Sequence, residues 1–369
     1  MQETQKTYSE IALSKVLLQE VKHKASLFEQ KYQHKPAFME VCGSHTMALA
    51  KTGIKQALVN DVDLISGPGC PVCVTDQSSI EAMITLSEMK DVIICTFGDM
   101  MRVPGSKRTL MEAKTFGSDV RVLYSPVDAI QIAIDNPDKK VIFLGIGFET
   151  TIPILALIVK IAEEKGVDNF FLWLSTKMVE PILRKLLDDQ DVHLDGFLLP
   201  GHVSIVTGVD DYNYLVNEYN MSGVISGFEP LEILGGLIKL LDSLLEERYE
   251  IINDHPKVVR KEGNTVTRSI MNHYLEKCDE AWRGMGVIPQ SGMDLKTEFD
   301  KYNAKKQFMV SIPSPRKTKC RCGEVIRGLI SPQQCALFGK ACVPTNPIGP
   351  CMVSSEGSCA AAFQYLRED

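Results

Sequence analysis

Cysteines are the residues of this chain with the most evident capacity for chemistry, and 11 occur among its 369 residues. Thiolates bind zinc and iron–sulfur clusters, and a site with four cysteine ligands would leave other thiols free for redox work. Six cysteines crowd into the last fifty residues with the spacing C-x-C-x12-C-x6-C-x8-C-x7-C: Cys320, Cys322, Cys335, Cys342, Cys351 and Cys359. The spacing predicts a metal or redox site but leaves open which thiols bind and which metal they hold.

Three more cysteines lie far upstream in two short motifs. Cys42 and His45 occur in Cys-Gly-Ser-His-Thr, and Cys70 and Cys73 form a C-x-x-C after Gly-Pro-Gly. At the start of a helix, the dipole and free N–H groups would lower the pKa of the Cys42 thiol, with His45 on the same face. A buried thiol beside a hydrogen-bonded histidine is the plainer alternative. The C-x-x-C is typical of an exchangeable disulfide or of half a zinc site.

Composition and charge narrow the class of protein. The chain is 44% hydrophobic and 24% charged, as in ordinary globular proteins, and its net charge of −7 argues against a nucleic-acid partner. The first residues are polar, without the apolar core of a signal peptide, and the most apolar run, 152–159, is too short to span a membrane. We therefore expect a cytoplasmic protein, where clustered cysteines indicate metal or redox function rather than structural disulfides.

Short apolar runs alternate with amphipathic stretches between residues 37 and 227. This alternation predicts an α/β fold with mainly parallel sheets covered by helices on both faces. The strands are expected at Ala37–Cys42, Val62–Ser66, Val92–Phe97, Val120–Tyr124, Lys140–Gly145, Phe170–Leu174, Gly196–Leu199 and Gly223–Ser226. An irregular tract at 100–117 interrupts the rhythm and favours two α/β domains over one wide sheet.

The expected domain organisation follows from these elements. A helical segment at 1–36 precedes α/β domains at 37–118 and 119–228, and residues 229–369 form a helical segment and a C-terminal cysteine region. Helical patterns are expected at 229–247 and near 267–283, and the chain becomes irregular beyond residue 284. Little apolar surface remains there to form a core, so we expect a bound metal to hold this small region together.

Polar, glycine-containing segments follow the predicted strands at their carboxyl ends. They are residues 42–46, 67–73, 97–105, 145–151 and 200–202. Ligands of open α/β sheets bind at that edge, so the segments predict a shared cleft. The pattern Gly145-Ile146-Gly147 lacks the third glycine of a dinucleotide fingerprint, because position 150 is threonine, and no P-loop occurs. A tight turn before a helix is the better interpretation of that segment.

The long motifs together resemble the HypD family of hydrogenase maturation factors. The resemblance rests on Cys42–Thr46, Gly67–Cys73, Phe97–Gly105, Gly145–Thr151, Cys320–Gly323 and Gly349–Gly357, and it runs from about residue 37 to the end. It implies a scaffold that works with the small chaperone HypC to build the Fe(CN)2CO moiety of [NiFe]-hydrogenase. It further implies that HypE donates cyanide, which HypF supplies through carbamoyl phosphate chemistry. A protein of this kind assembles a metallocofactor and is not a simple turnover enzyme.

The resemblance also assigns roles to individual residues. Cys42 would bind the iron together with a cysteine of HypC, and Cys70 and Cys73 would be a redox-active pair nearby. The irregular C-terminal iron–sulfur region would hold a [4Fe–4S] cluster beside a disulfide, as in ferredoxin:thioredoxin reductase. Its ligands would be Cys320, Cys335, Cys342 and Cys359, with Cys322 and Cys351 as the adjacent pair. As a hypothesis of our own, His45 and Glu356 would orient these sulfurs or move protons near them.

Two other functions remain consistent with the residues alone. A thiol–disulfide oxidoreductase related to ferredoxin:thioredoxin reductase needs only the C-x-x-C and the C-terminal tract. A zinc-stapled interaction protein needs only four of the C-terminal thiols.

Overall fold

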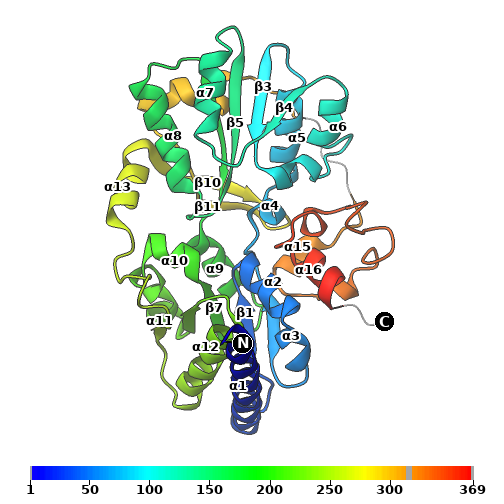
Figure 1. The fold of residues 1–369 in the computed structure, drawn as a ribbon, viewed down its shortest axis with the longest axis vertical. Coiled ribbons are helices and arrows are strands. Elements are labelled where there is room, and N and C mark those ends of the chain that lie inside the picture. The colour runs from blue at the N-terminus through cyan, green and yellow to red at the C-terminus, as the bar shows by residue number, and fades with distance from the viewer. Residues whose placement is uncertain (1, 313–317, 367–369) are drawn as a thin grey trace.

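Two parallel sheets form the framework of the computed structural model, which describes residues 2–312 and 318–366. The lower sheet in Figure 1 has the strand order β2-β1-β7-β8-β9, and the upper sheet has the order β4-β3-β5-β6. The lower strands are β1 (Ala37–Glu40), β2 (Asp63–Ser66), β7 (Gly196–Pro200), β8 (Ser222–Ser226) and β9 (Ile251–Asn253). The upper strands are β3 (Val92–Thr96), β4 (Asp119–Val122), β5 (Lys140–Gly147) and β6 (Phe170–Thr176). The predicted α/β class and the eight predicted strands are confirmed.

Helices cover both sheets and make two lobes. The lower lobe contains α1 (Gln2–Tyr32), α2 (Gly43–Lys51), α3 (Ile54–Ala57), α9 (Val179–Leu187), α10 (Gly201–Thr207), η2 (Asp210–Tyr212), α11 (Asn213–Tyr219) and α12 (Pro230–Leu245). The upper lobe contains α5 (Gln77–Ser87), η1 (Gly98–Arg102), α6 (Leu110–Thr115), α7 (Asp128–Asp135) and α8 (Ile152–Glu164). Among the described residues, no helix combines the length and apolar character needed to cross a bilayer.

The chain passes from the lower lobe to the upper lobe and back again. Strands β1 and β2 belong to the lower sheet, β3 to β6 to the upper sheet, and β7 to β9 to the lower sheet again. The expected domain boundary between residues 118 and 119 therefore falls inside the upper sheet, where β3 and β4 pair in parallel. Alternating strands and helices look alike in both lobes, so the sequence pattern does not show at which strand the chain changes sheets.

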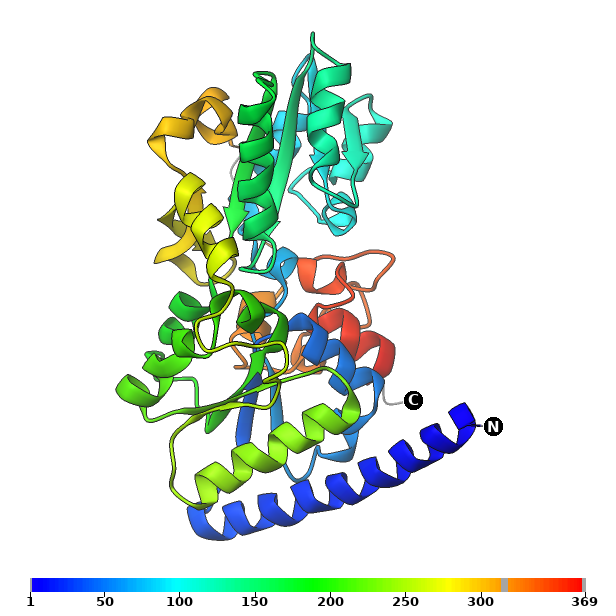
Figure 2. The ribbon, with the colours of Figure 1, turned by 60° about the vertical axis from the view of Figure 1, so that its left-hand side comes forward.

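The N-terminal helix forms the base of the lower lobe. Figure 2 shows α1 running along α12, and Phe28 is buried between them with 2% of its surface exposed. Lys24 Nζ lies 2.6 Å from Asp242 Oδ1, and the Tyr32 hydroxyl donates to the Leu244 carbonyl at 2.7 Å. This helix therefore completes the hydrophobic core beneath the lower sheet.

The junction of the lobes is built from several short elements. These are α4 (Pro71–Val74), α13 (Thr265–Tyr274) and the antiparallel hairpin of β10 (Leu275–Trp282) and β11 (Gly286–Leu295). The following η3 (Thr297–Tyr302) and α14 (Ala304–Gln307) lie against the upper lobe, where Asn303 forms a bridge with Leu172 of β6 (Figure 1). The hairpin corrects two sequence predictions, because residues 275–282 were expected to be helical and residues beyond 284 irregular. Pairing with β11 along the whole of β10 outweighs the helical pattern of the sequence.

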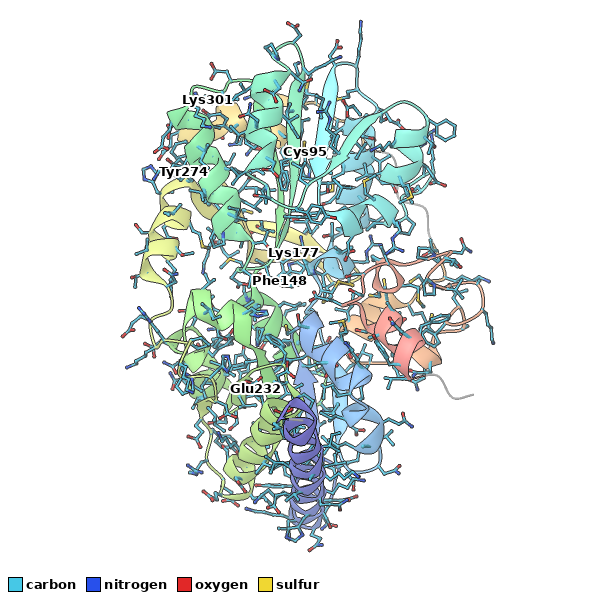
Figure 3. All side chains as sticks on the ribbon, viewed as in Figure 1. Cys95, Phe148, Lys177, Glu232, Tyr274 and Lys301 are labelled. Carbon is cyan, nitrogen blue, oxygen red and sulfur yellow. A yellow bond between two sulfur atoms is a disulfide. The ribbon has the colours of Figure 1, made fainter. Side chains whose placement is uncertain are left out.

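A buried ion pair lies at this junction beside Phe148 (Figure 3). Lys177, which follows β6, is 0% exposed, and its Nζ lies 2.9 Å from Glu280 Oε1 on β10. The lysine ammonium also lies 5.8 Å from the centre of the Trp282 ring. A buried charge needs a partner, so this pair ties the upper sheet to the hairpin.

The C-terminal region lies beside the junction and contains little regular structure (Figure 1). Its elements are α15 (Cys322–Ile326), η4 (Pro332–Gln334), η5 (Pro350–Met352) and α16 (Ser358–Tyr365). Isolated bridges at Phe338–Cys342 and Val343–Asn346 order the segment between η4 and η5. The expectation of a small, irregular C-terminal region is confirmed in this respect.

Candidate thiol and metal site

Cys42 lies where the lower sheet reverses its strand order. The chain continues from β1 to β2 on one side and from β7 to β8 on the other, so β1 and β7 flank the switch point. Cys42 lies two residues after the end of β1 and is the N-cap residue of α2. A switch point opens a crevice at the carboxyl ends of strands, where α/β proteins bind ligands. The predicted position of Cys42 at the start of a helix is therefore confirmed.

The predicted effect of the helix on the thiol is not found. Burial, together with the charge of the nearby Glu356 carboxylate, raises the pKa of Cys42 to about 11, although part of the residue remains exposed. The backbone N–H groups of Ser44 and His45 act in the expected direction and lower the pKa. The loss of hydration outweighs these donors, because burial in a low dielectric destabilises the thiolate more than the N–H groups of one helix turn stabilise it.

The His45 side chain points away from the Cys42 thiol. Its Nε2 lies 2.9 Å from the Gly227 carbonyl, and its ring lies 4.6 Å from that of Phe228. The imidazole is 0% exposed, and burial lowers its pKa, so the neutral form is favoured. Its contacts hold α2 against the end of β8, which makes His45 a support for the Cys42 turn.

The Gly-Pro-Gly loop packs directly on the Cys42 turn. A β-carbon at Gly69 would overlap the backbone of Cys42, and the Gly43 N–H donates to the Gly69 carbonyl at 3.3 Å. A β-carbon at Gly43 would in turn collide with the Glu356 side chain. Glycine is required at both positions by close approach, and the two upstream motifs form one unit.

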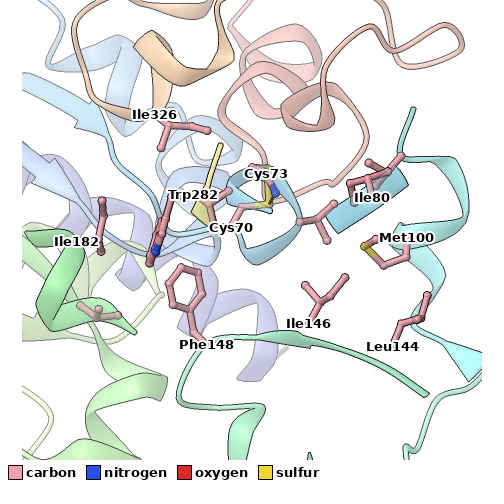
Figure 4. Packing of buried hydrophobic residues seen from close by; sticks show 14 of the residues in the cluster. Cys70, Cys73, Ile80, Met100, Leu144, Ile146, Phe148, Ile182, Trp282 and Ile326 are labelled. Carbon is pink, nitrogen blue, oxygen red and sulfur yellow. Dashed lines mark hydrogen bonds between the residues drawn. A yellow bond between two sulfur atoms is a disulfide. The ribbon is translucent and has the colours of Figure 1, made fainter. Parts of the chain in front are cut away.

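Cys70 and Cys73 form a disulfide within the single turn of α4. The Cys73 N–H donates to Cys70 Sγ at 3.2 Å, and the two residues are 5% and 2% exposed. Figure 4 shows the disulfide among apolar side chains of three different regions, namely Trp282 of the hairpin, Phe148 and Ile146 at the end of β5, and Ile326 of α15. The C-x-x-C thus lies where both lobes, the hairpin and the C-terminal region meet.

The segment 350–357 connects the C-terminal tract to both upstream motifs. Cys73 Sγ lies 3.9 Å from the Pro350 carbonyl. The Ser44 hydroxyl donates to Glu356 Oε1 at 2.7 Å, and Arg102 Nη2 donates to the Val353 carbonyl at 3.0 Å. One segment is therefore held by the Cys42 turn and by the 97–105 segment of the upper lobe. These contacts place Glu356 beside the Cys42 turn, and its expected role in orienting the sulfurs or moving protons near them stays a prediction.

All six C-terminal cysteines line one small cavity of about 10 Å³. The other lining residues carry no charge: Val325, Leu337, Phe338, Gly349 and Met352. Within the described ranges, no three His, Cys, Asp or Glu side chains converge on a position for a single metal ion. Zinc needs such convergence, whereas the ligands of an iron–sulfur cluster each bind a separate iron. This uncharged set of soft donors fits a cluster in its chemistry, and the tight packing requires the thiols to separate around one.

The thiols also differ in their electrostatics. Hydrogen bonds from Cys320 and Cys351, together with the charge of Arg283, lower the pKa of Cys322. The same hydrogen bonds raise the pKa of Cys320 and of Cys351. Cys322 and Cys351 are therefore in direct contact, and both belong to the same buried cluster as Cys70 and Cys73.

Arg283 is a residue of the site that the sequence did not indicate. It lies at the tip of the β10–β11 hairpin, where its Nε donates to the Thr75 carbonyl at 2.9 Å and its Nη1 donates to Gln77 Oε1 at 2.8 Å. Sequence patterns placed this segment in a helix, so no signal connected it with the C-x-x-C. Its position depends on the hairpin, which forms only through tertiary pairing.

The other thiols lie further from the junction. Cys335 follows η4, Cys342 lies in the bridge with Phe338, and Cys359 lies in the first turn of α16 next to Cys351. Cys95 is fully buried in β3, and Cys278 lies in β10. The site therefore has an inner group, formed by the upstream thiols together with Cys322 and Cys351, and an outer group formed by the other four C-terminal thiols.

Comparison with known proteins places these motifs in a wider group. A family model described as "HypD: Hydrogenase formation hypA family" matches residues 13–366. The chain is 40% identical over 358 residues to the hydrogenase maturation factor HypD of Escherichia coli K12, covering 96% of this chain and 95% of that protein. It is 39% identical over 360 residues to HypD of Rhodobacter capsulatus, with 96% of each chain covered. HypD2 of Bradyrhizobium diazoefficiens is 40% identical over 339 residues, with 89% of each chain covered.

Proposed function

This chain belongs to the HypD family of hydrogenase maturation factors, and from that premise we propose that it is the scaffold on which the Fe(CN)2CO moiety of [NiFe]-hydrogenase is assembled. The observation that carries the proposal is the junction of three thiol motifs. The Cys42 turn packs on the C-x-x-C loop, and the disulfide in turn contacts the segment that carries Cys351. A site that loads iron and handles electrons needs this proximity of ligand and redox groups.

Cys42 is the residue that we propose as the ligand of the iron cargo. It lies at the sheet switch point and is partly exposed. A low-spin iron that carries cyanide and carbon monoxide suits a soft thiolate ligand. We further propose that a cysteine of a HypC-type chaperone shares this iron and that a HypE-type protein donates the cyanide. Loading takes place in the cytoplasm, where free thiols persist.

The Cys70–Cys73 pair and the Cys322–Cys351 pair can exchange electrons in a balanced reaction. Reduction of the Cys70–Cys73 disulfide breaks its S–S bond and consumes two electrons and two protons. Oxidation of Cys322 and Cys351 to a disulfide releases the same number of each. The buried position of both pairs keeps external thiols from intercepting this exchange.

Four further thiols would hold a [4Fe–4S] cluster, in the assignment that we favour. They are Cys320, Cys335, Cys342 and Cys359. When bound, such a cluster supplies electrons one at a time to neighbouring thiols. Contact of Cys320 with Cys322, and of Cys359 with Cys351, connects this outer set to the inner pair.

Burial of the disulfide argues against the general oxidoreductase. An enzyme that reduces the disulfide of a partner protein must bring that disulfide to its own dithiol. The 5% and 2% exposure of Cys70 and Cys73 does not permit such contact in this conformation. Electrons delivered to this disulfide stay inside the protein, as a scaffold requires.

The experiment that tests the proposal is replacement of Cys42. We expect Cys42→Ser to abolish the infrared cyanide and carbonyl bands of the protein purified under argon with its HypC-type partner. The visible absorbance of the C-terminal cluster should remain, because Cys42 lies in the lower lobe. Cys278→Ser, a partly buried thiol on the hairpin, is the matched control and should retain the bands. Retention of the bands in Cys42→Ser would contradict the assignment.

Metal analysis separates the cluster from the zinc alternative. About four irons per chain with acid-labile sulfide are expected after anaerobic purification. One zinc per chain without sulfide would support a zinc-stapled protein instead.

A further inference from the structure

A second cavity lies between the lobes and contains none of the cysteines. It has a volume of about 340 Å³. Its walls come from the turn after β5, the start of α9, helix α10, η2, helix α13 and the hairpin. The apolar part of the lining consists of Met178, Val179, Val203, Val206, Met271, Leu275 and Met293. The proposed assembly of the iron site makes no use of this space.

Glu149 contributes a buried carboxylate to this cavity. The residue is 4% exposed, and its Oε1 accepts a hydrogen bond from the Val179 N–H at 2.7 Å. Its Oε2 is buried without a hydrogen-bond partner among the described residues. A buried carboxylate oxygen without a donor is costly, so such an atom in a cavity wall indicates a missing donor.

The charges around the cavity favour a cation as that donor. Asp211 and Glu180 line the same space and both raise the pKa of Glu149 through their negative charge. Arg268 is already engaged, because its Nη1 donates to the Thr207 carbonyl at 2.7 Å and to Asp211 Oδ1 at 3.1 Å. The remaining lining charges are Glu276 and Lys277, so carboxylates outnumber cations.

A single metal ion does not suit this set of carboxylates. Divalent cations need several oxygen ligands that converge on one point. No group of three acidic or histidine side chains in the described parts of the chain meets that condition. An organic cation needs only one or two acceptors, and it can place its carbon atoms against the methionine and valine side chains of the walls.

We propose that this cavity binds a small aliphatic amine, whose ammonium group donates a hydrogen bond to Glu149 Oε2 while its alkyl chain packs against the apolar wall. The ammonium supplies the donor that Glu149 lacks, and the apolar wall discriminates against hydrated inorganic cations. A free amine and a lysine side chain of a bound protein share this chemistry.

Isothermal titration of the full-length protein tests the proposal with two probes of equal charge. n-Butylammonium has N–H donors and an alkyl chain, whereas tetramethylammonium has the charge without a donor. At about pH 8, above the pKa of about 7 that burial gives Glu149, the carboxylate is ionised. We expect saturable binding of n-butylammonium at one site and binding of tetramethylammonium that is weaker by about tenfold or more. Nα-acetyl-lysine methylamide distinguishes a free amine from a lysine side chain, because it carries the backbone atoms of a lysine residue. It should bind only if the cavity accepts a lysine of a bound protein.

Two variants and one control locate the binding. Glu149→Gln keeps an acceptor for the Val179 N–H but removes the charge, and it should weaken n-butylammonium by about tenfold or more. Val206→Phe narrows the cavity without changing a carboxylate, and it should abolish binding of n-butylammonium. If Glu149→Gln fails to fold, Val206→Phe provides the test. Glu164→Gln removes an exposed charge from the end of α8 and should leave binding unchanged. Equal binding of both cations, no saturable binding, or full binding by both cavity variants would overturn the proposal.

Discussion

The upstream thiols and the C-terminal thiols are positioned in different ways. Cys42 and the C-x-x-C follow strands of a parallel sheet, and close glycine contacts fix their loops against each other. The C-terminal thiols lie on or beside short helices, 3-10 turns and an isolated bridge. A backbone framework therefore holds the first group whether or not a metal is bound. The second group depends on its own side chains, and on whatever joins them, for its structure.

This difference matches the division of labour that we propose. A cargo site must keep its shape while iron enters and leaves, and a sheet edge provides that rigidity. A resident cluster stays in place, so its binding free energy can serve as folding free energy for a small region with little core. The two groups should therefore respond in opposite ways to loss of a thiol.

The largest effect is expected when outer thiols are removed from the C-terminal region. Cys335 and Cys342 are 9% and 7% exposed and fill its centre, so replacing both by serine puts hydroxyl groups in an apolar cavity. We expect trypsin cleavage after the exposed Lys340 to become faster by roughly tenfold or more, because local opening governs proteolysis. Cys42→Ser should leave this cleavage rate unchanged. Equal protection of both variants would mean that the C-terminal region holds itself together without its thiols.

The upstream site should instead lose stability when the backbone contact between its loops is disturbed. Gly69→Ala places a β-carbon on the backbone of Cys42, where no side-chain rotation relieves the overlap. We expect the free energy of unfolding in urea to fall by about 3 kcal/mol. Gly98→Ala is the control, since its β-carbon would meet only Val122 at an ordinary 3.7 Å. A Gly69→Ala protein as stable as the control would show that the loop is mobile rather than fixed by this contact.

Much of the fold could be predicted from the sequence because the strands are regular. Each of the eight predicted strands overlaps an observed one, from β1 to β8, since buried parallel strands are apolar and β-branched. The β10–β11 hairpin could not be predicted, because β10 carries exposed polar residues and owes its structure to pairing with β11. The sequence also carries no local signal for the points at which the chain passes from one lobe to the other.

The site shows the same limit. The sequence identified Cys42, Cys70 and Cys73 as chemically active types at strand ends, and the structure brings them together. It did not identify Arg283 or the burial that raises the pKa of Cys42, because both depend on contacts between distant segments. The direction of the His45 side chain was likewise inaccessible, since Gly227 lies 182 residues away.

Glu149 is a position at which pH should alter the stability of the framework. Burial raises the pKa of Glu149 from its ordinary 4.5 to about 7, so the folded state favours the protonated carboxyl. Stability that is present below pH 4.5 is therefore lost as the pH rises toward 7, by an amount on the order of 2 to 3 kcal/mol. The difference in unfolding free energy between wild type and Glu149→Gln should grow over this range. A difference that does not vary with pH would show that the pKa of Glu149 in the folded protein is the ordinary one. As a control, the protection of Lys340 from trypsin should not change with the Glu149→Gln substitution.

The smallest effect concerns the contact that joins the two regions. Ser44 adjoins the Cys42 turn and donates to Glu356 Oε1 at 2.7 Å, so a double-mutant cycle with alanine at both positions measures the coupling directly. We expect a coupling of about 1 kcal/mol in unfolding free energy, because the acceptor is a carboxylate in a partly buried setting. The exposed pair Gln131 and Asp135, with Nε2 and Oδ1 2.8 Å apart on α7, is the control and should give about 0.3 kcal/mol. A coupling no larger than the control would mean that the C-terminal region docks through its backbone and apolar contacts alone. In that case both single variants should still protect Cys42 from alkylation, whereas a true tether should leave it more reactive when either partner is lost.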